Sequence, residues 1–302
     1  MKLSKLFLLC VLCFISCKTD KKKDNLNEET SYDFSKTNLI YHIAALSSNE
    51  FEGRETGTEG AKKAKEYIIK AFQQLNVEPL GETFEQVFPM PETSNIAQGE
   101  NILGVVKGTT EPNTYIVISA HYDHLGIRNG QIYNGADDDA SGVSALFAFA
   151  EYFQKYPPKY SVIFAAFDAE EKGLVGSYYF VDNPIIKKEQ IKLNINMDMI
   201  SRSKKKELYA VGPQHYPSYK SLVETTKAHG NVILKIGHEE WTTASDHAAF
   251  HKANIPFIYF GVEDHKDYHR PTDDFENIHL DFYVNSVQTI INFFKKVEET
   301  SL

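Results

Sequence analysis

The chain has 302 residues, of which 42% are hydrophobic and 24% charged, as in an ordinary globular protein. Its 32 lysines and arginines stand against 41 aspartates and glutamates, so the formal net charge is −9 at pH 7. This acidic balance excludes a typical nucleic-acid-binding protein, and the length allows one large domain or two small ones.

Residues 1–17 have the pattern of a signal peptide. Lys2 and Lys5 give a basic start, and residues 6–15 form an apolar run that is too short to span a bilayer. The four residues that end at Cys17 resemble the lipobox of bacterial lipoproteins, although Phe14 replaces the usual leucine. Residues 18–31 are charged and polar and show no apolar periodicity, which predicts a flexible tether over residues 18–34.

Cleavage before Cys17 would remove the other two cysteines, Cys10 and Cys13, and would leave lipid on Cys17. The mature chain would then contain no disulfide. We therefore expect a lipoprotein of the cell envelope, anchored in the outer membrane and either periplasmic or exposed at the surface.

The native protein should partition with membranes, and Cys17→Ser should release or mislocalise it. A single acyl chain binds membranes only marginally, so stable anchoring needs the several chains of a true lipoprotein. Cell fractionation checks this expectation. A native protein that is soluble and unlipidated, with an ordinary signal-peptidase cut elsewhere, would contradict it.

From residue 35 to residue 302 no low-complexity linker interrupts the chain, and we expect a single domain. Apolar residues at helical spacing predict helices, in chain order, over residues 39–46, 64–75, 140–153, 219–228 and 281–297. Apolar runs rich in β-branched residues predict buried strands over residues 115–120, 160–167, 193–196 and 255–260. Segments 83–88 and 101–107 are expected to add antiparallel strands at one edge.

This alternation predicts an α/β fold, a three-layer α/β/α sandwich with a mostly parallel, mixed central sheet. In such sheets ligands gather beyond the carboxyl ends of the strands. Polar residues follow the predicted strands at these ends, and they include His121, Asp138, Glu171, Asp198 and His269. Two imidazoles and three carboxylates are the ligand types that hold a pair of zinc ions, with one carboxylate bridging both.

Taken singly, each of these pieces has an ordinary explanation. An isolated histidine is more often a surface or core residue than a ligand. Asp137 to Asp139 have the composition of a helix start, and Glu170-Glu171 that of a solvated turn. The five motifs occur together, in this order and at predicted strand ends. This combination makes a metal site a better interpretation than five separate structural roles.

The sequence resembles metallopeptidase family 28 (clan MH), the bacterial leucyl-aminopeptidase-like di-zinc peptidases, from about residue 46 to residue 278. The most specific motifs are Gly-Ala-Asp-Asp-Asp-Ala-Ser-Gly at 135–142 and Asp-Ala-Glu-Glu at 168–171, and residues 53–60 are similar to a common opening of bacterial members. The resemblance implies that Asp138 bridges two zinc ions. It places Glu171 and His269 on one ion, and His121 and Asp198 on the other.

The resemblance also implies the roles of three further residues. Glu170 occupies the position of the general base, which takes a proton from water and delivers it to the leaving amine. Asp123 would accept a hydrogen bond from His121 and fix its tautomer. Tyr268 stands where some members place an oxyanion donor, although a packed loop aromatic explains it equally well.

Other residues compete for these roles or surround them. His124 and His265 are rival ligands, and we prefer His269 because Pro271 and Asp273 after it fit the family pattern. The Ser-Asp-His segment at 245–247 resembles a family segment that packs beneath the last histidine, but it also has the composition of a helix start. Candidate walls of a substrate pocket are Trp241, Tyr259 and Phe260.

The sequence therefore favours a di-zinc aminopeptidase that acts on peptides with a free N-terminus outside the cytoplasm. Glutaminyl-peptide cyclotransferase, which has the same fold and a single zinc, is the alternative enzyme. From a different class, a surface-binding lipoprotein could keep the fold without catalysis, but such a protein would show substituted ligands or a missing base.

Overall fold

Continuous apolar runs form the middle of the central sheet. The computed structural model describes residues 31–301, and in it β7 (Tyr160–Phe167) is buried at every position. β4 (Glu111–His121) lies beside β7 and is buried over its last six residues. Strands covered on both faces cannot alternate apolar and polar residues, which explains why their sequences are apolar throughout.

The sheet of residues 31–301 has nine strands in the order β1-β3-β7-β4-β8-β11-β9-β10, and β2 also pairs with β3. The pairs β7–β4, β4–β8, β8–β11 and β9–β10 are parallel, whereas β1, β2 and β7 are antiparallel to β3, and β9 is antiparallel to β11. The remaining bounds are β1 (Glu78–Pro79), β2 (Glu85–Pro89), β3 (Gln98–Val106), β8 (Ile191–Met197), β9 (Glu207–Val211), β10 (Ile233–Ile236) and β11 (Phe257–Gly261).

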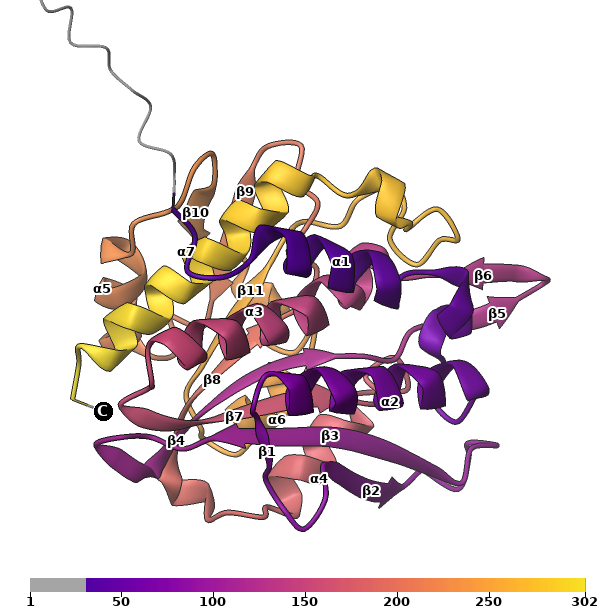
Figure 1. Ribbon diagram of the computed structural model, residues 1–302, viewed down its shortest axis with the longest axis horizontal. Helices are drawn as coiled ribbons and strands as arrows, with labels where there is room; N and C mark the ends of the chain where they lie inside the picture. The colour runs from indigo at the N-terminus through magenta and orange to yellow at the C-terminus, as the bar shows by residue number, and fades with distance from the viewer. Residues whose placement is uncertain (1–30, 302) are drawn as a thin grey trace, which may run out of the picture. The chain divides into compact units, whose positions relative to one another are not determined.

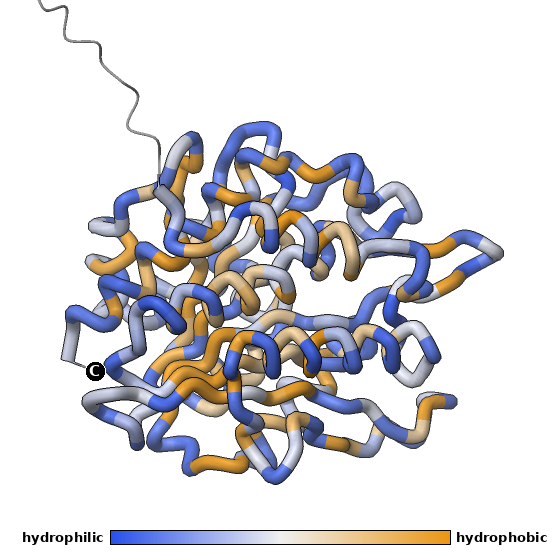
Figure 2. Tube along the Cα trace, viewed as in Figure 1, coloured by the Kyte–Doolittle hydropathy of each residue, from blue (hydrophilic) through white to orange (hydrophobic). Residues whose placement is uncertain are grey.

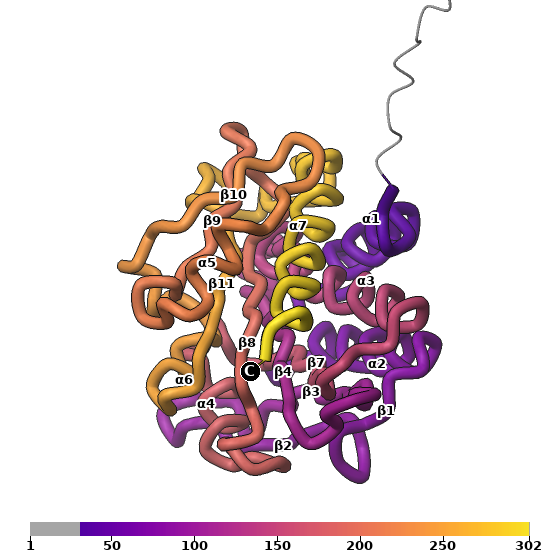
Figure 3. Tube along the Cα trace, turned by 90° about the vertical axis from the view of Figure 1, so that its left-hand side faces the viewer, coloured from indigo at the N-terminus to yellow at the C-terminus, as the bar shows by residue number. Residues whose placement is uncertain are grey.

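Helices cover both faces of the sheet and complete three layers (Figures 1 and 3). One face carries α1 (Lys36–Leu46), α2 (Glu59–Gln74), α3 (Ser141–Lys155) and α7 (Leu280–Glu298), which share a core with alternate residues of β4 and β7. The opposite face carries α4 (Val175–Asp182) and α6 (His247–Lys252). α5 (Pro217–Thr225) packs against α7. Apolar segments are concentrated in the sheet, between the two helical layers (Figure 2).

The predicted fold class is confirmed, and the expected helices and strands are present with shifted ends. The last parallel strand begins at Phe257, two residues later than expected, after Pro256, which has no N–H to donate. The elements that the sequence pattern did not reveal are short, and they include α4, α6, β1, β9 and β10. Another is the hairpin of β5 (Gly126–Arg128) and β6 (Gln131–Tyr133), which projects from the body in Figure 1. Short elements span too few residues to show a period.

The predicted signal peptide, Cys17 and most of the predicted tether lie outside the described residues. The tether was expected to extend to residue 34, but Phe34 is buried in the core, and the Tyr32 hydroxyl donates to Asn285 of α7. The packed part of the chain thus begins earlier than the sequence suggested. Among the helices described, none combines the length and apolar character needed to cross a bilayer.

Candidate metal centre

The five predicted ligand residues converge at the carboxyl end of the parallel strands. His121 is the last residue of β4, and Asp198 directly follows β8. Glu171 lies in the turn after β7, and Asp138 in the turn that leads into α3. His269 comes from the loop after β11. Because β7, β4, β8 and β11 are parallel neighbours, residues far apart in sequence meet at one edge.

Asp138 lies between two pairs of these residues. Its Oδ1 is 3.1 Å from Nε2 of His121, and the same nitrogen is 3.5 Å from Oδ1 of Asp198. Its Oδ2 is 3.2 Å from Nε2 of His269, which is 3.3 Å from Oε1 of Glu171. The result is two adjacent clusters that share one carboxylate, an arrangement that can hold two cations side by side.

The donor atoms themselves point to cations. His121 Nε2, Asp138 Oδ2 and Glu171 Oε1 are buried and have no hydrogen-bond partner among the described residues. Buried polar atoms are rarely left unpaired, because each one costs about 1–3 kcal/mol. Imidazole nitrogens and carboxylate oxygens in such a position are ordinary zinc ligands. The residues present therefore fit a pair of zinc ions.

The three consecutive aspartates do three different things. Asp137 accepts hydrogen bonds from the backbone and the hydroxyl of Ser201. Asp139 accepts from the backbone N–H groups of His121, Gly142 and Met199, which ties the ends of β4 and β8 to the start of α3. Only Asp138 faces the clusters. A solvated helix start would leave all three exposed, yet all three are buried.

Asp123 supports the site differently from our expectation. His121 Nδ1 meets the backbone carbonyl of Asp123 at 3.1 Å, whereas the carboxylate is 3.7 Å away, too far for a hydrogen bond. A proton on Nδ1, donated to that carbonyl, leaves the lone pair of Nε2 facing Asp138. The carboxylate instead accepts from the backbone N–H groups of Glu170 and Glu171, at 3.0 and 3.2 Å. It thereby orients the two glutamates.

The side chain of Glu170 lies on the His121 side of the centre. A carboxylate oxygen of Glu170 and ligand atoms of His121 and Asp198 all lie within 4.8 Å of one another. Burial raises the pKa of Glu170 well above its ordinary value, and the charge of Asp198 adds to this effect while His121 opposes it. A carboxyl group with a raised pKa can both accept and return a proton near neutral pH.

A cavity of about 70 Å³ opens on this centre. Trp241, Tyr259 and Tyr268 line it, and the ring of Tyr268 stacks on that of His269 with centroids 3.9 Å apart. Phe260, which we expected in the wall, is fully buried and packs against Phe293 of α7 instead. Successive residues of a strand point to opposite faces, so Tyr259 and Phe260 cannot both face the cavity.

The structure also shows where the other candidate residues lie relative to the two clusters. His265 Nε2 lies 3.1 Å from Asp137 Oδ2, so this histidine contacts the neighbour of Asp138 rather than the clusters.

Asp246 precedes α6, but its side chain makes no capping hydrogen bond, contrary to the helix-start explanation. Burial raises the pKa of Asp246 to about 7, and His121, rather than His269, is the charged group that most opposes this rise.

Arg54 is a supporting residue that sequence reasoning did not single out. It is fully buried, and its guanidinium donates to four backbone carbonyls. The acceptors are Tyr122 at 2.8 Å, Leu46 at 2.7 Å, Asn134 at 2.6 Å and Gly135 at 2.9 Å. Arg54 thus joins the segment after β4 to the segment before the aspartate turn. The sequence alone carries no signal that distinguishes it from a surface arginine.

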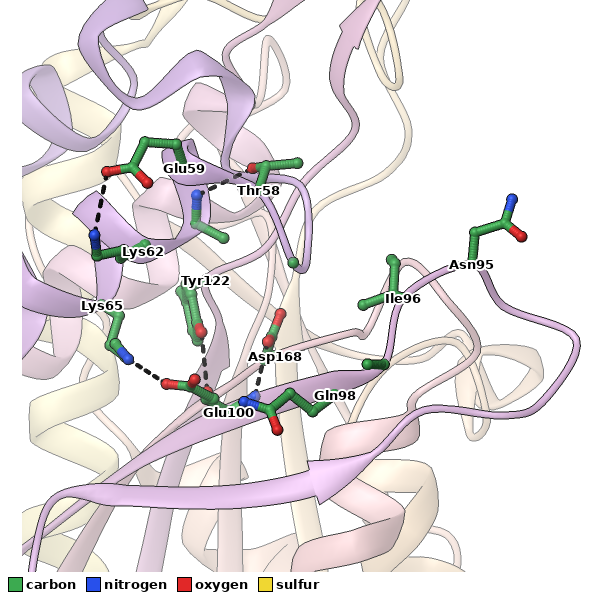
Figure 4. A pocket seen from close by; sticks show the side chains of 13 residues that line it. Thr58, Glu59, Lys62, Lys65, Asn95, Ile96, Gln98, Glu100, Tyr122 and Asp168 are labelled. Carbon is green, nitrogen blue, oxygen red and sulfur yellow. Dashed lines mark hydrogen bonds and ion pairs between the residues drawn. The ribbon is translucent and has the colours of Figure 1, made fainter.

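A second and larger cavity, of about 440 Å³, lies near the N-terminus of α2, and none of the predicted site residues lines it. Lys65 forms an ion pair there with Glu100 (Figure 4). The backbone carbonyl of Glu100 accepts a hydrogen bond from the Tyr122 hydroxyl, and its backbone N–H donates one to Asp168. Because these polar groups already have partners, the cavity offers no comparable donor set.

Comparisons with known proteins show which family and which folds the chain is similar to. The model of peptidase family M28 matches residues 101–294. Aminopeptidase YwaD of Bacillus subtilis is 32% identical over 193 residues, which are 59% of this chain and 40% of YwaD. A probable zinc metalloprotease of Pyrenophora tritici-repentis is 32% identical over 130 residues, 41% of this chain and 28% of that protein. The chain thus spans less than half the length of these two relatives.

Two solved structures share the fold over most of this chain. A zinc aminopeptidase from Bacillus subtilis has a TM-score of 0.72 at 18% identity, covering 89% of this chain and 97% of its own. Glutaminyl cyclase of Porphyromonas gingivalis has a TM-score of 0.74 at 18% identity, covering 88% and 100%. At this identity both show the fold alone.

The fold and the paired clusters define an α/β protein with a candidate metal centre at the carboxyl end of its parallel strands. Because the family model covers most of it, the chain belongs to peptidase family M28, which confirms the resemblance seen in its motifs.

Proposed function

We propose that this protein is a zinc-dependent aminopeptidase that removes N-terminal amino acids from peptides, with two zinc ions held by His121, Asp138, Glu171, Asp198 and His269. The observation that carries the proposal is the position of Asp138, whose two oxygens each face a different histidine at 3.1 and 3.2 Å. When bound, zinc lowers the pKa of water to near neutrality and polarises a carbonyl group.

The protein's own residues supply the proton transfer. Glu170 takes a proton from the attacking water on a carboxylate oxygen and later delivers it to the departing amine. Asp123 holds the backbone of Glu170 in place for this task. Tyr268 lines the cavity, where its hydroxyl can donate a hydrogen bond to the developing oxyanion.

The charge of the cavity favours recognition of an N-terminus. Once zinc neutralises Asp138 and Asp198, the lining still includes the carboxylates of Glu170 and Asp264, and no lysine or arginine of the described residues is among the lining residues. An α-ammonium group is attracted by such a surface, whereas the C-terminal carboxylate of a peptide would be repelled. The small volume leaves room for the end of a chain rather than for its middle.

A panel of anilide substrates tests this proposal. An aminoacyl-anilide with a free amine should be hydrolysed, and its N-acetylated counterpart should react at least about a hundredfold more slowly, since the loss of a charged recognition contact costs several kcal/mol. Chelation should abolish activity, and added zinc should restore it. Equal rates on free and blocked substrates, or full activity in a metal-free preparation, would contradict the proposal.

The same panel distinguishes the cyclase alternative. A peptide with N-terminal glutamine should lose that glutamine by hydrolysis if the protein is an aminopeptidase. Release of ammonia with a cyclised N-terminus, and no hydrolysis of the other anilides, would instead identify a cyclotransferase.

A further inference from the structure

His124 is a buried histidine near the metal centre for which the family pattern provides no role. It lies three residues after the end of β4 and is 0% exposed. Neither of its ring nitrogens has a hydrogen-bond partner among the described residues. An imidazole that is fully removed from water and makes no hydrogen bond, although its Nδ1 lies close to a carboxylate, requires an explanation.

One ring nitrogen of His124 faces the same two oxygens as His269. Nδ1 of His124 lies 2.8 Å from Glu171 Oε1 and 3.6 Å from Asp138 Oδ2. The corresponding distances for Nε2 of His269 are 3.3 and 3.2 Å. Four ligand atoms at about 2.0–2.1 Å from one zinc ion in a tetrahedron lie about 3.3 Å apart, so both nitrogens have ligand-like separations.

The backbone holds the ring of His124 in this direction. Gly135 has a φ of +54°, and a Cβ atom there would lie 2.6 Å from Cγ and Cδ2 of His124. The ring therefore lies directly against a position that only glycine can occupy. On the other side, the backbone N–H of His124 donates to the carbonyl of Arg54 at 3.3 Å.

We propose that His124, through Nδ1, is a fourth protein ligand of the zinc ion held by Asp138, Glu171 and His269. This inference rests on the proposed di-zinc centre. The other ion has three protein ligands: His121, Asp138 and Asp198. Zinc sites with four protein ligands are closed, whereas catalytic sites keep a position open. The two zinc sites are thus unequal. The ion on the His121 side exchanges readily with solution, whereas the ion on the His124 side is retained.

The decisive measurement detects the bond itself. The protein is produced with nitrogen-labelled histidine, loaded with an NMR-active cadmium isotope in place of zinc, and examined for cadmium–nitrogen couplings. We expect three coupled imidazoles, two through Nε2 and one through Nδ1. Two coupled imidazoles, both through Nε2, would make His124 only a neighbour of Glu171 and would overturn the inference while leaving the di-zinc proposal intact.

Variants assign the third signal. His124→Phe should remove the Nδ1 coupling and weaken one of two zinc sites by more than the roughly 10–100-fold that loss of a supporting residue costs. His251→Phe is the matched control, because His251 packs against Phe257 and belongs to neither group of candidate ligands among the described residues. It should keep all three couplings. An Nδ1 coupling that persists in His124→Phe would overturn the assignment.

Zinc titration of the wild-type protein separates the two proposals. Two sites with clearly different affinities, the tighter of which is weakened by His124→Phe, support the inference. Two sites that both keep their affinity in this variant contradict the inference alone. A wild-type protein that binds no zinc contradicts the proposed function and the inference with it.

Discussion

Glu170→Gln should lower turnover roughly a hundredfold or more while the zinc content stays close to that of the wild-type protein. The substitution removes the proton acceptor but leaves His121, Asp138 and Asp198 in place. The amide is nearly the same size as the carboxyl group, and the backbone N–H at 3.0 Å from Asp123 is retained. Substrate affinity should therefore change much less than turnover. Steady-state kinetics beside metal analysis of the same preparation provide the test.

The adjacent glutamate supplies the matched comparison. Glu171→Gln removes a charged group that lies 3.3 Å from His269, so it should lower zinc occupancy, and excess zinc should restore part of the activity. Equal metal loss in both variants would make Glu170 a ligand or a residue of the fold. Turnover near that of the wild-type protein in Glu170→Gln would remove this residue from the mechanism.

Arg54→Met should destabilise the fold by about 3–5 kcal/mol, the range expected when a buried charged group loses its hydrogen bonds. The methionine fills part of the space but leaves four buried carbonyls without their donor. It also removes a positive charge that attracts Asp138 and Asp139. Urea unfolding of the metal-free protein measures this loss without the contribution of bound zinc.

Arg128→Met is the control for Arg54→Met. Arg128 is exposed on the β5–β6 hairpin, and its side chain donates to the carbonyl of Leu125. Its loss should change stability by no more than about 0.5 kcal/mol. Similar unfolding midpoints for the two variants would mean that Arg54 does not hold the segments around the metal centre together.

The parallel strands and long helices could be predicted from sequence because burial on both faces, or on one helical face, leaves a regular pattern. The pattern locates β7 at its observed residues, Tyr160–Phe167. Convergence of the five clustered residues followed from the topology of a parallel sheet, without knowledge of any side-chain contact.

Individual contacts could not be predicted in the same way. His121 contacts the backbone carbonyl of Asp123, whereas the sequence pattern pointed to the carboxylate of that residue. The burial of Arg54 depends on carbonyls from three separate segments. Tyr259 and Phe260 are adjacent and both aromatic, so only the register of β11 decides which one faces the cavity.

The order in which the clustered residues occur along the chain governs when the centre can form. Four of them precede β9, whereas His269 follows β11, and within residues 31–301 a short 3-10 helix and α7 come after it. A nascent chain that still lacks this loop has an incomplete ligand set, even though β4, β7 and β8 are already synthesised. If the five residues hold zinc as proposed, chains interrupted before residue 269 should therefore lack hydrolase activity.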